Sequence, residues 1–196
     1  MKKQTLKEYQ GKRDFQKTPE PRGSAGRKTG QPLFVIQKHA ASTLHYDFRL
    51  EVEGVLKSWA VPKGPSTDPR VKRLAVPTED HPLQYAQFEG VIPEEEYGGG
   101  TVLIWDTGTY RNLKAEDPDH EPMSMTEALA SGHLTIWLEG HKLKGGFAMI
   151  RTARGDWLLI KMKDEWADAE HDPLVTRPES AVSGRTLEEI AGDTGR

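Results

Sequence analysis

A succession of short strand-like runs, separated by turn residues, is the feature that most constrains how this chain can fold. The runs begin at Phe34, and segments that would suit a helix are scarce among them. Residues 45–53 and 55–61 form the clearest pair, because Gly54 separates them as in a β-hairpin. About eight to ten short strands at this spacing are typical of a closed barrel or a sandwich. One face of nearly every run is small or polar, which favours the barrel. The predicted fold is mainly β: a compact closed antiparallel β-barrel of about eight strands with a few short helices.

The remaining elements follow from the same patterns. Further strands are expected at residues 34–38, 73–76, 101–105, 109–112, 134–139, 143–151 and 157–163. Residues 106–108 are expected to form the turn of a second hairpin, and residues 79–82 an acidic turn. Helices are expected at 124–131 and 186–191, the first of which begins with a Ser-x-x-Glu capping box, and a short helical turn at 164–169.

The length of 196 residues suits one domain with a substantial core. Charge is distributed unevenly: residues 1–30 carry a balance of +6 and the rest of the chain −9, for a net charge of −3. We expect a basic N-terminal arm at 1–32, a barrel domain at 33–180, and a short helix and tail at 181–196. A basic arm can follow phosphate groups locally, and the alternative is a disordered solubilising tail.

Several classes of protein are excluded by composition. Cysteine is absent, which excludes disulfides and thiolate zinc sites. No stretch approaches the ~20 apolar residues of a membrane span, and no apolar segment follows the basic N-terminus. We therefore expect a cytoplasmic protein with no membrane partner. Since no long apolar surface helix indicates an obligate dimer, a monomer is expected.

The segment from His45 to Glu51 carries the clearest chemical signal. Alternation along a strand places His45, Asp47 and Arg49 on one face, with the first two Cα atoms about 6.5 Å apart. His39 lies six residues before His45 and can fold back toward the same point. Two imidazoles and a carboxylate can bind a divalent transition metal and leave positions open. The alternative is a half-exposed strand with an internal salt bridge.

Further cationic and titratable groups follow this segment. Lys63 stands where a strand meets a tight Gly-Pro loop, and Arg73 opens the next strand; each either contacts a phosphate or is solvated. His81 can serve as a general acid or base, or it is a surface turn residue. Glycines 98–100 lack the frame of a phosphate-binding loop. The other histidines are interpreted as structural or exposed: His120, His133, His141 and His171.

Taken together, these segments resemble the 3′-phosphoesterase domain found at the N-terminus of bacterial ligase D proteins and as a stand-alone protein in some bacteria and archaea. The resemblance rests on K12-R13-D14-F15 with T18-P19-E20-P21, and on the runs FVIQKHAASTLHYDFRLE, KSWAVPKGPS, KRLAV, EDHP, FEG, YGGGTVLIWDTGTY, LKGGFAMIRT, WLLIKMKD and SGRTLEEIA. It covers almost the whole chain. No ligase or polymerase module fits within this length.

The resemblance implies a β-barrel repair enzyme that depends on Mn²⁺, with Co²⁺ or Zn²⁺ as alternatives. Such an enzyme removes a 3′-terminal ribonucleoside to leave a 3′-phosphate, and then hydrolyses that phosphate to a 3′-OH. Carried over by position, the metal ligands are His39, His45 and Asp47. The implied catalytic residues are His81, Arg49 and Arg13. The implied phosphate contacts are Lys63, Arg73, Arg13 and Arg49. The implied supporting residues are Asp14, Glu20, Glu79, Ser58 and Tyr85.

The implied partners are DNA or DNA/RNA 3′ ends at primer–template junctions, together with ligase, polymerase and Ku-type end-joining proteins. Two other functions stay open: a catalytically inactive module that binds 3′ ends, and a metal phosphoesterase for small phosphate esters. Glu95 departs from the family pattern, because it occupies a position where members usually have glycine. If that position requires a positive φ, glutamate costs about 1 kcal/mol there.

Overall fold

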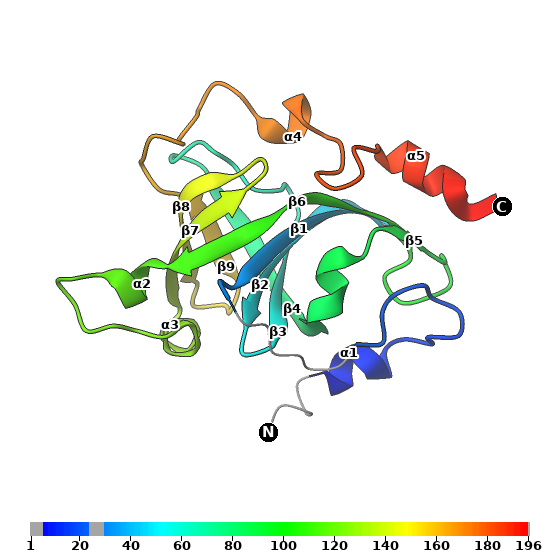
Figure 1. Ribbon diagram of the computed structural model, residues 1–196, viewed down its shortest axis with the longest axis horizontal. Helices are drawn as coiled ribbons and strands as arrows, with labels where there is room; N and C mark the ends of the chain where they lie inside the picture. Colours follow the sequence, from blue (N-terminus) through cyan, green and yellow to red (C-terminus); the bar gives the residue numbers. More distant parts are fainter. Residues whose placement is uncertain (1–5, 24–29, 196) are drawn as a thin grey trace.

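The computed structural model describes residues 6–23 and 30–195, and within them one antiparallel sheet of nine strands dominates (Figure 1). The strand order is β1-β2-β3-β4-β9-β8-β7-β6-β5, and β1 also pairs with β6. This second pairing closes an eight-stranded barrel and leaves β5 outside it, which confirms the predicted barrel. The strands are β1 Leu33–Ala40, β2 Leu44–Val52, β3 Val55–Val61, β4 Lys72–Pro82, β5 Gly90–Ile92, β6 Gly100–Asn112, β7 His133–Gly140, β8 Lys144–Arg151 and β9 Trp157–Lys161.

The sheet is covered by apolar side chains on both of its faces. Buried residues from all eight barrel strands fill the interior, including Phe34, Phe48, Trp105 and Phe147. A second cluster lies on the opposite face of β1, β3 and β6 and includes Tyr9 from the N-terminal segment. This second cluster attaches α1 (Lys7–Gly11) and the 3₁₀ helix η1 (Leu83–Gln87) to the outside of the barrel (Figure 1).

The predicted hairpin at residues 101–112 is wrong, because β6 runs through the expected turn as one continuous strand. The Asp106 carboxylate accepts backbone N–H groups from Thr107, His141, Lys142 and Leu143, so it stabilises the β7–β8 turn instead of forming its own. Gly108 is required by packing, since an added Cβ would lie 2.0 Å from the Glu139 carbonyl oxygen.

The predicted acidic turn at residues 79–82 is also wrong, because these residues complete β4. The pairing of β3 with β4 shifts register between Leu56 and Ser58. At this irregularity Asp80 pairs with Lys57 at 2.8 Å. The register shift, absent from the sequence pattern, re-aims the side chains at the end of β4.

The predicted longer helices are confirmed, and the other helices are short. Capping boxes open both α3 (Met125–Ser131) and α5 (Leu187–Ala191). Residues 164–169 form turns without a helix. The remaining elements are α2 Leu113–Glu116, α4 Pro173–Thr176 and the 3₁₀ helix η2 Gly192–Gly195. Among the residues that the structure describes, no helix has the length and apolar character needed to cross a membrane.

Candidate metal and anion site

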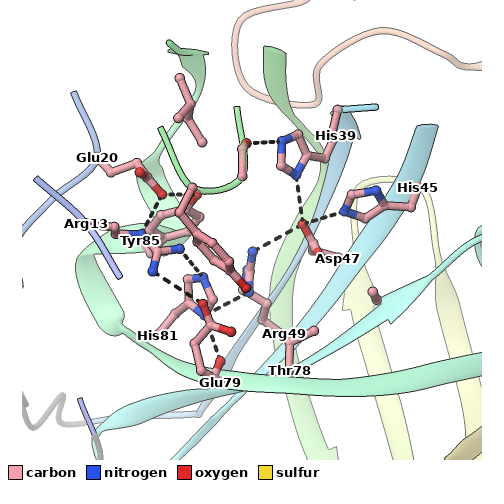
Figure 2. Close-up of a pocket in the computed structure, with 15 residues that line it drawn as sticks. Arg13, Glu20, His39, His45, Asp47, Arg49, Thr78, Glu79, His81 and Tyr85 are labelled. Carbon is pink, nitrogen blue, oxygen red and sulfur yellow. Dashed lines mark hydrogen bonds and ion pairs between the residues drawn. The ribbon is translucent and has the colours of Figure 1, made fainter. Parts of the chain in front are cut away.

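A cavity of about 250 Å³ lies on the outer face of the barrel, where β1 to β4 meet the N-terminal segment (Figure 2). It contains most of the residues singled out from the sequence. Its lining consists of Arg13, Glu20, His39, Ala41, His45, Asp47, Arg49, Ala60, Thr78, Glu79, His81, Tyr85, Ile92, Tyr97 and Gly98.

Strand alternation places the polar face of β2 in this cavity. Tyr46 and Phe48 point into the barrel core, so Asp47 and Arg49 face outward, where both are buried by neighbouring elements. The β1–β2 register pairs His39 directly with His45, and their rings lie 4.8 Å apart. The short connection between the histidines is therefore the turn of a β-hairpin.

Three groups converge on one carboxylate oxygen, Asp47 Oδ2. His39 Nδ1 lies 3.6 Å from it, His45 Nε2 3.5 Å and Arg49 Nη2 3.3 Å (Figure 2). The ligand atoms of the two histidines and the aspartate all lie within 4.8 Å of one another. This is the separation expected of groups that share one ion.

Backbone carbonyls fix which imidazole nitrogen carries the proton. His39 Nε2 lies 2.8 Å from the Gly98 carbonyl oxygen, and His45 Nδ1 lies 3.0 Å from that of Thr43. Because a carbonyl oxygen only accepts, each of these nitrogens donates its N–H. The lone pairs of the other two nitrogens therefore face the Asp47 carboxylate. This donor set fits a divalent cation, since neutral imidazoles oriented by outer hydrogen bonds are the usual form of histidine ligands.

The electrostatics keep the aspartate ionised. Burial would raise the pKa of Asp47, but the Arg49 guanidinium and the two imidazoles hold it well below its usual range. Contact with Asp47 raises the pKa of His45 despite its partial burial. The carboxylate is therefore a ready ligand at neutral pH.

Arg49 connects the histidine–aspartate group to His81. Its Nε donates to Gln37 Oε1 at 2.7 Å, and its Nη1 lies 3.1 Å from His81 Nδ1. Its guanidinium also lies over the Tyr85 ring, 4.9 Å from the centroid. Fixed on several sides, Arg49 presents a cation with little freedom to reorient.

The N-terminal segment supplies a second buried cation, Arg13. Its Nε donates to Glu20 at 2.9 Å, and its Nη1 pairs with Glu79 at 3.3 Å. Glu20 also accepts the Tyr85 hydroxyl at 3.0 Å. Arg13 Nη2 lies 3.5 Å from His81 Nε2, so the two arginines approach opposite nitrogens of one imidazole. Segments distant in sequence thus meet around His81.

His81 is held neutral by its surroundings. Burial and the nearby Arg49 and Arg13 guanidiniums place its pKa well below the ordinary 6.5. A proton on Nδ1 satisfies two contacts, donation to the Glu79 carbonyl oxygen at 2.9 Å and acceptance at Nε2 from Arg13 Nη2 at 3.5 Å. In that tautomer Arg49 Nη1, 3.1 Å from Nδ1, makes a close contact and no hydrogen bond. An anion bound between the two arginines would offset the lowering of the His81 pKa that their charges cause.

Four residues proposed from the sequence do not line the cavity. Lys63 is exposed beyond the end of β3, and Asp14 is exposed on the N-terminal segment. Ser58 is buried and donates to the Leu56 carbonyl. Arg73 shares a face of β4 with Ala75, which packs in the barrel core, so strand alternation directs it away from the site. Phosphate contact by Lys63 or Arg73 stays a prediction.

Tyr97 and Thr78 line the cavity, and sequence reasoning gave them no role. The only signal for Tyr97 was its place before a glycine run. The possible strain at Glu95 does not arise: among the described non-glycine residues, positive φ occurs at Glu53 alone. Glu95 is exposed and is not part of the lining.

Comparison with known proteins identifies a family and several relatives that this chain matches. Residues 37–151 match the family described as the DNA ligase D 3′-phosphoesterase domain. The multifunctional non-homologous end joining protein LigD of Pseudomonas aeruginosa is 52% identical over 190 residues, covering 93% of this chain and 22% of the relative. The corresponding DNA repair protein LigD of Mycobacterium tuberculosis is 47% identical over 161 residues, covering 82% and 20%.

The chain spans about a fifth of the length of these relatives. The match nevertheless covers more than half of this chain and includes the paired histidines, Asp47, Arg49 and His81. The chain belongs to the DNA ligase D 3′-phosphoesterase domain family.

Proposed function

We propose that this protein is a Mn²⁺-dependent phosphoesterase that heals 3′ ends of DNA or DNA/RNA during end joining. It removes a 3′-terminal ribonucleoside and then the remaining 3′-phosphate, to leave a 3′-OH. The observation that carries the proposal is the cluster at Asp47, where two imidazole lone pairs and a carboxylate converge beside the Arg49 guanidinium. A cation site directly next to a fixed arginine suits a phosphate ester.

His39, His45 and Asp47 would hold the metal. A divalent cation bound there supplies Lewis-acid polarisation of a phosphoryl oxygen. Co²⁺ and Zn²⁺ suit the same nitrogen and oxygen ligands, and Mn²⁺ is the family expectation. The backbone carbonyls of Thr43 and Gly98 would keep each imidazole in the tautomer whose free nitrogen can bind the metal.

Arg49 and Arg13 would bind the remaining phosphoryl oxygens. Both guanidiniums are already paired with carboxylates and packed against rings, so little reorganisation is needed when charge develops in the transition state. His81 lies between them. With a phosphate bound, the negative charge raises the proton affinity of its Nε2, which can then hold a proton for the leaving oxygen.

The decisive assay uses a labelled primer–template with one 3′-terminal ribonucleotide, incubated with Mn²⁺, Mg²⁺ or EDTA. We expect shortening with Mn²⁺, followed by loss of the 3′-phosphate, and no reaction in EDTA. No shortening at any Mn²⁺ concentration would refute the enzymatic proposal.

The same assay separates the two other functions. An inactive end-binding module would retain the primer–template without turnover, and His81→Ala would leave that binding unchanged. A phosphoesterase for small esters would hydrolyse p-nitrophenyl phosphate with no preference for a primer–template junction. The proposed enzyme instead loses turnover in His81→Ala and prefers the DNA end.

A further inference from the structure

The rim of the cavity carries an aromatic ring that the proposed chemistry does not use. Three tyrosines lie around Arg13, but Tyr9 and Tyr85 are buried at 0% and 3% exposure, whereas Tyr97 is 48% exposed. Tyr97 nonetheless lines the same cavity as Asp47. A large aromatic side chain is thus presented to solvent at the mouth of the site.

Backbone hydrogen bonds hold the segment around Tyr97 next to the candidate metal ligands. The Glu96 N–H donates to the Pro93 carbonyl and the Gly99 N–H to the Glu96 carbonyl, both at 3.0 Å, which closes a tight turn around Tyr97. The next residue, Gly98, provides the carbonyl that orients His39. The Tyr97 backbone is therefore held next to the residue whose carbonyl orients His39.

Cations from the N-terminal segment lie over the ring. Lys12 Nζ is 5.0 Å and Arg13 Cζ 5.3 Å from the Tyr97 ring centroid. The ring is still 48% exposed with these two cations over it. An exposed π-surface next to two cations matches a nucleotide, in which an aromatic base is attached to an anionic phosphate. A small phosphate ester would contact the cations and leave the exposed part of the ring unused.

The geometry points to Tyr97 as the stacking platform for the base of the 3′-terminal nucleoside, a substrate-positioning role that rests on the proposed function. Arg13 lines the same cavity and would hold the phosphate while the ring receives the attached base. Stacking is tolerant of sequence because every base has a π-face. The platform therefore favours nucleosides over other leaving groups without selecting one base.

The test is a double-mutant cycle with two changes, made separately and together. One removes the base from the substrate, and the other removes the Tyr97 ring from the protein. Primer–templates ending in a 3′ adenosine or in a base-free ribose are compared for Kd in EDTA and for kcat/KM with Mn²⁺. In the wild type, removing the base should weaken binding about tenfold, in line with single-base stacking. In Tyr97→Ala the two substrates should bind equally, and Tyr97→Phe should restore the tenfold preference.

Trp166→Ala is the matched control, because Trp166 is 45% exposed and also contacts a lysine, Lys144 at 5.1 Å, without lining the cavity. It should keep the wild-type preference.

Two outcomes would overturn the inference. The first is that Tyr97→Ala weakens the binding of both substrates by the same factor and so keeps the tenfold preference, because the ring would then only support the N-terminal segment. Loss of preference in Tyr97→Phe would also overturn it. Since Kd is measured without turnover, a failure of the phosphoesterase proposal appears separately, as absent shortening in the wild type.

Discussion

Among the described residues, two of the places where a histidine lies next to an aspartate are instructive to compare, because the same contact has different surroundings in each. In the loop after β9, His171 Nδ1 lies 2.9 Å from Asp168, with side chains 72% and 43% exposed. In the cavity, His45 lies 3.5 Å from Asp47, with side chains 23% and 9% exposed. The surface pair is the closer one. Proximity of imidazole to carboxylate is therefore not what marks a candidate metal site.

The difference lies in how many groups converge and what fixes them. Asp168 accepts backbone N–H groups of its own turn and one imidazole, as an aspartate capping a loop does. Asp47 instead faces two imidazoles whose protons are committed elsewhere, together with Arg49. The Asp168 carboxylate is satisfied by the hydrogen bonds it accepts. At Asp47 two imidazole lone pairs face a carboxylate, so a bound cation or added protons are needed to offset the repulsion between them.

The largest expected effect follows from removing one imidazole in each region. His45→Ala should lower Mn²⁺-dependent end trimming by at least ~100-fold, because it removes a ligand outright and even partners of ligands cost 10–100-fold. His171→Ala should stay within about twofold. Turnover against Mn²⁺ concentration measures both, with circular dichroism to verify folding. Similar losses in the two variants would remove the distinction between the regions.

The next effect tests the cation beside the carboxylate. Arg49→Ala should lower kcat by about 100- to 1000-fold, the usual result of removing a donor that stabilises a developing oxyanion. Arg70 is the control, since it also pairs with an aspartate, Asp68 at 2.9 Å, but its side chain is 77% exposed. Arg70→Ala should leave kcat unchanged. An unchanged kcat in Arg49→Ala would exclude it from the phosphoryl chemistry.

A smaller effect concerns stability. Glu20→Gln should reduce the free energy of unfolding by about 3 kcal/mol, because Arg13 is buried and would lose a charged partner. Glu8→Gln, which breaks the largely exposed pair with Lys12, should cost about 0.5 kcal/mol or less. Urea denaturation of both variants measures the difference. Equal costs would show that the N-terminal segment is not anchored through Arg13.

The smallest effect is a pH dependence. Folding lowers the pKa of His81, so the unfolded chain binds a proton that the folded protein refuses. The contribution of His81 is therefore favourable above its unfolded pKa of about 6.5 and is lost as the pH falls below that value. His81→Asn should lose less thermal stability than the wild type between pH 7 and 5. Parallel Tm curves for the two proteins would contradict a neutral, buried imidazole.

Much of the fold and part of the site could be predicted because they depend on local periodicity. The alternation from His45 to Val52 determines which side chains enter the core, and the pairing of His39 with His45 follows from a hairpin of that length. The predicted hairpin at 101–112 failed for a tertiary reason: Asp106 was interpreted as a turn former, but its carboxylate serves backbone groups more than 30 residues away.

The sequence by itself determined most of the strands, the polar face of β2 and the three candidate ligands, two on β2 and one on β1, since each depends on neighbours within about ten residues. The barrel class followed from the number and spacing of the strands, whereas its closure depends on the long-range pairing of β1 with β6. Only the tertiary structure decided which other groups join the three candidate ligands. The register shift in β4 sets the aim of Glu79 and His81, and the second apolar cluster holds Arg13 against residues 66 and 68 positions away. The same packing directs Arg73 away from the cavity and exposes Tyr97 at its rim. Strand periodicity is a short-range property, whereas the convergence of charges is decided by long-range packing that no local pattern records.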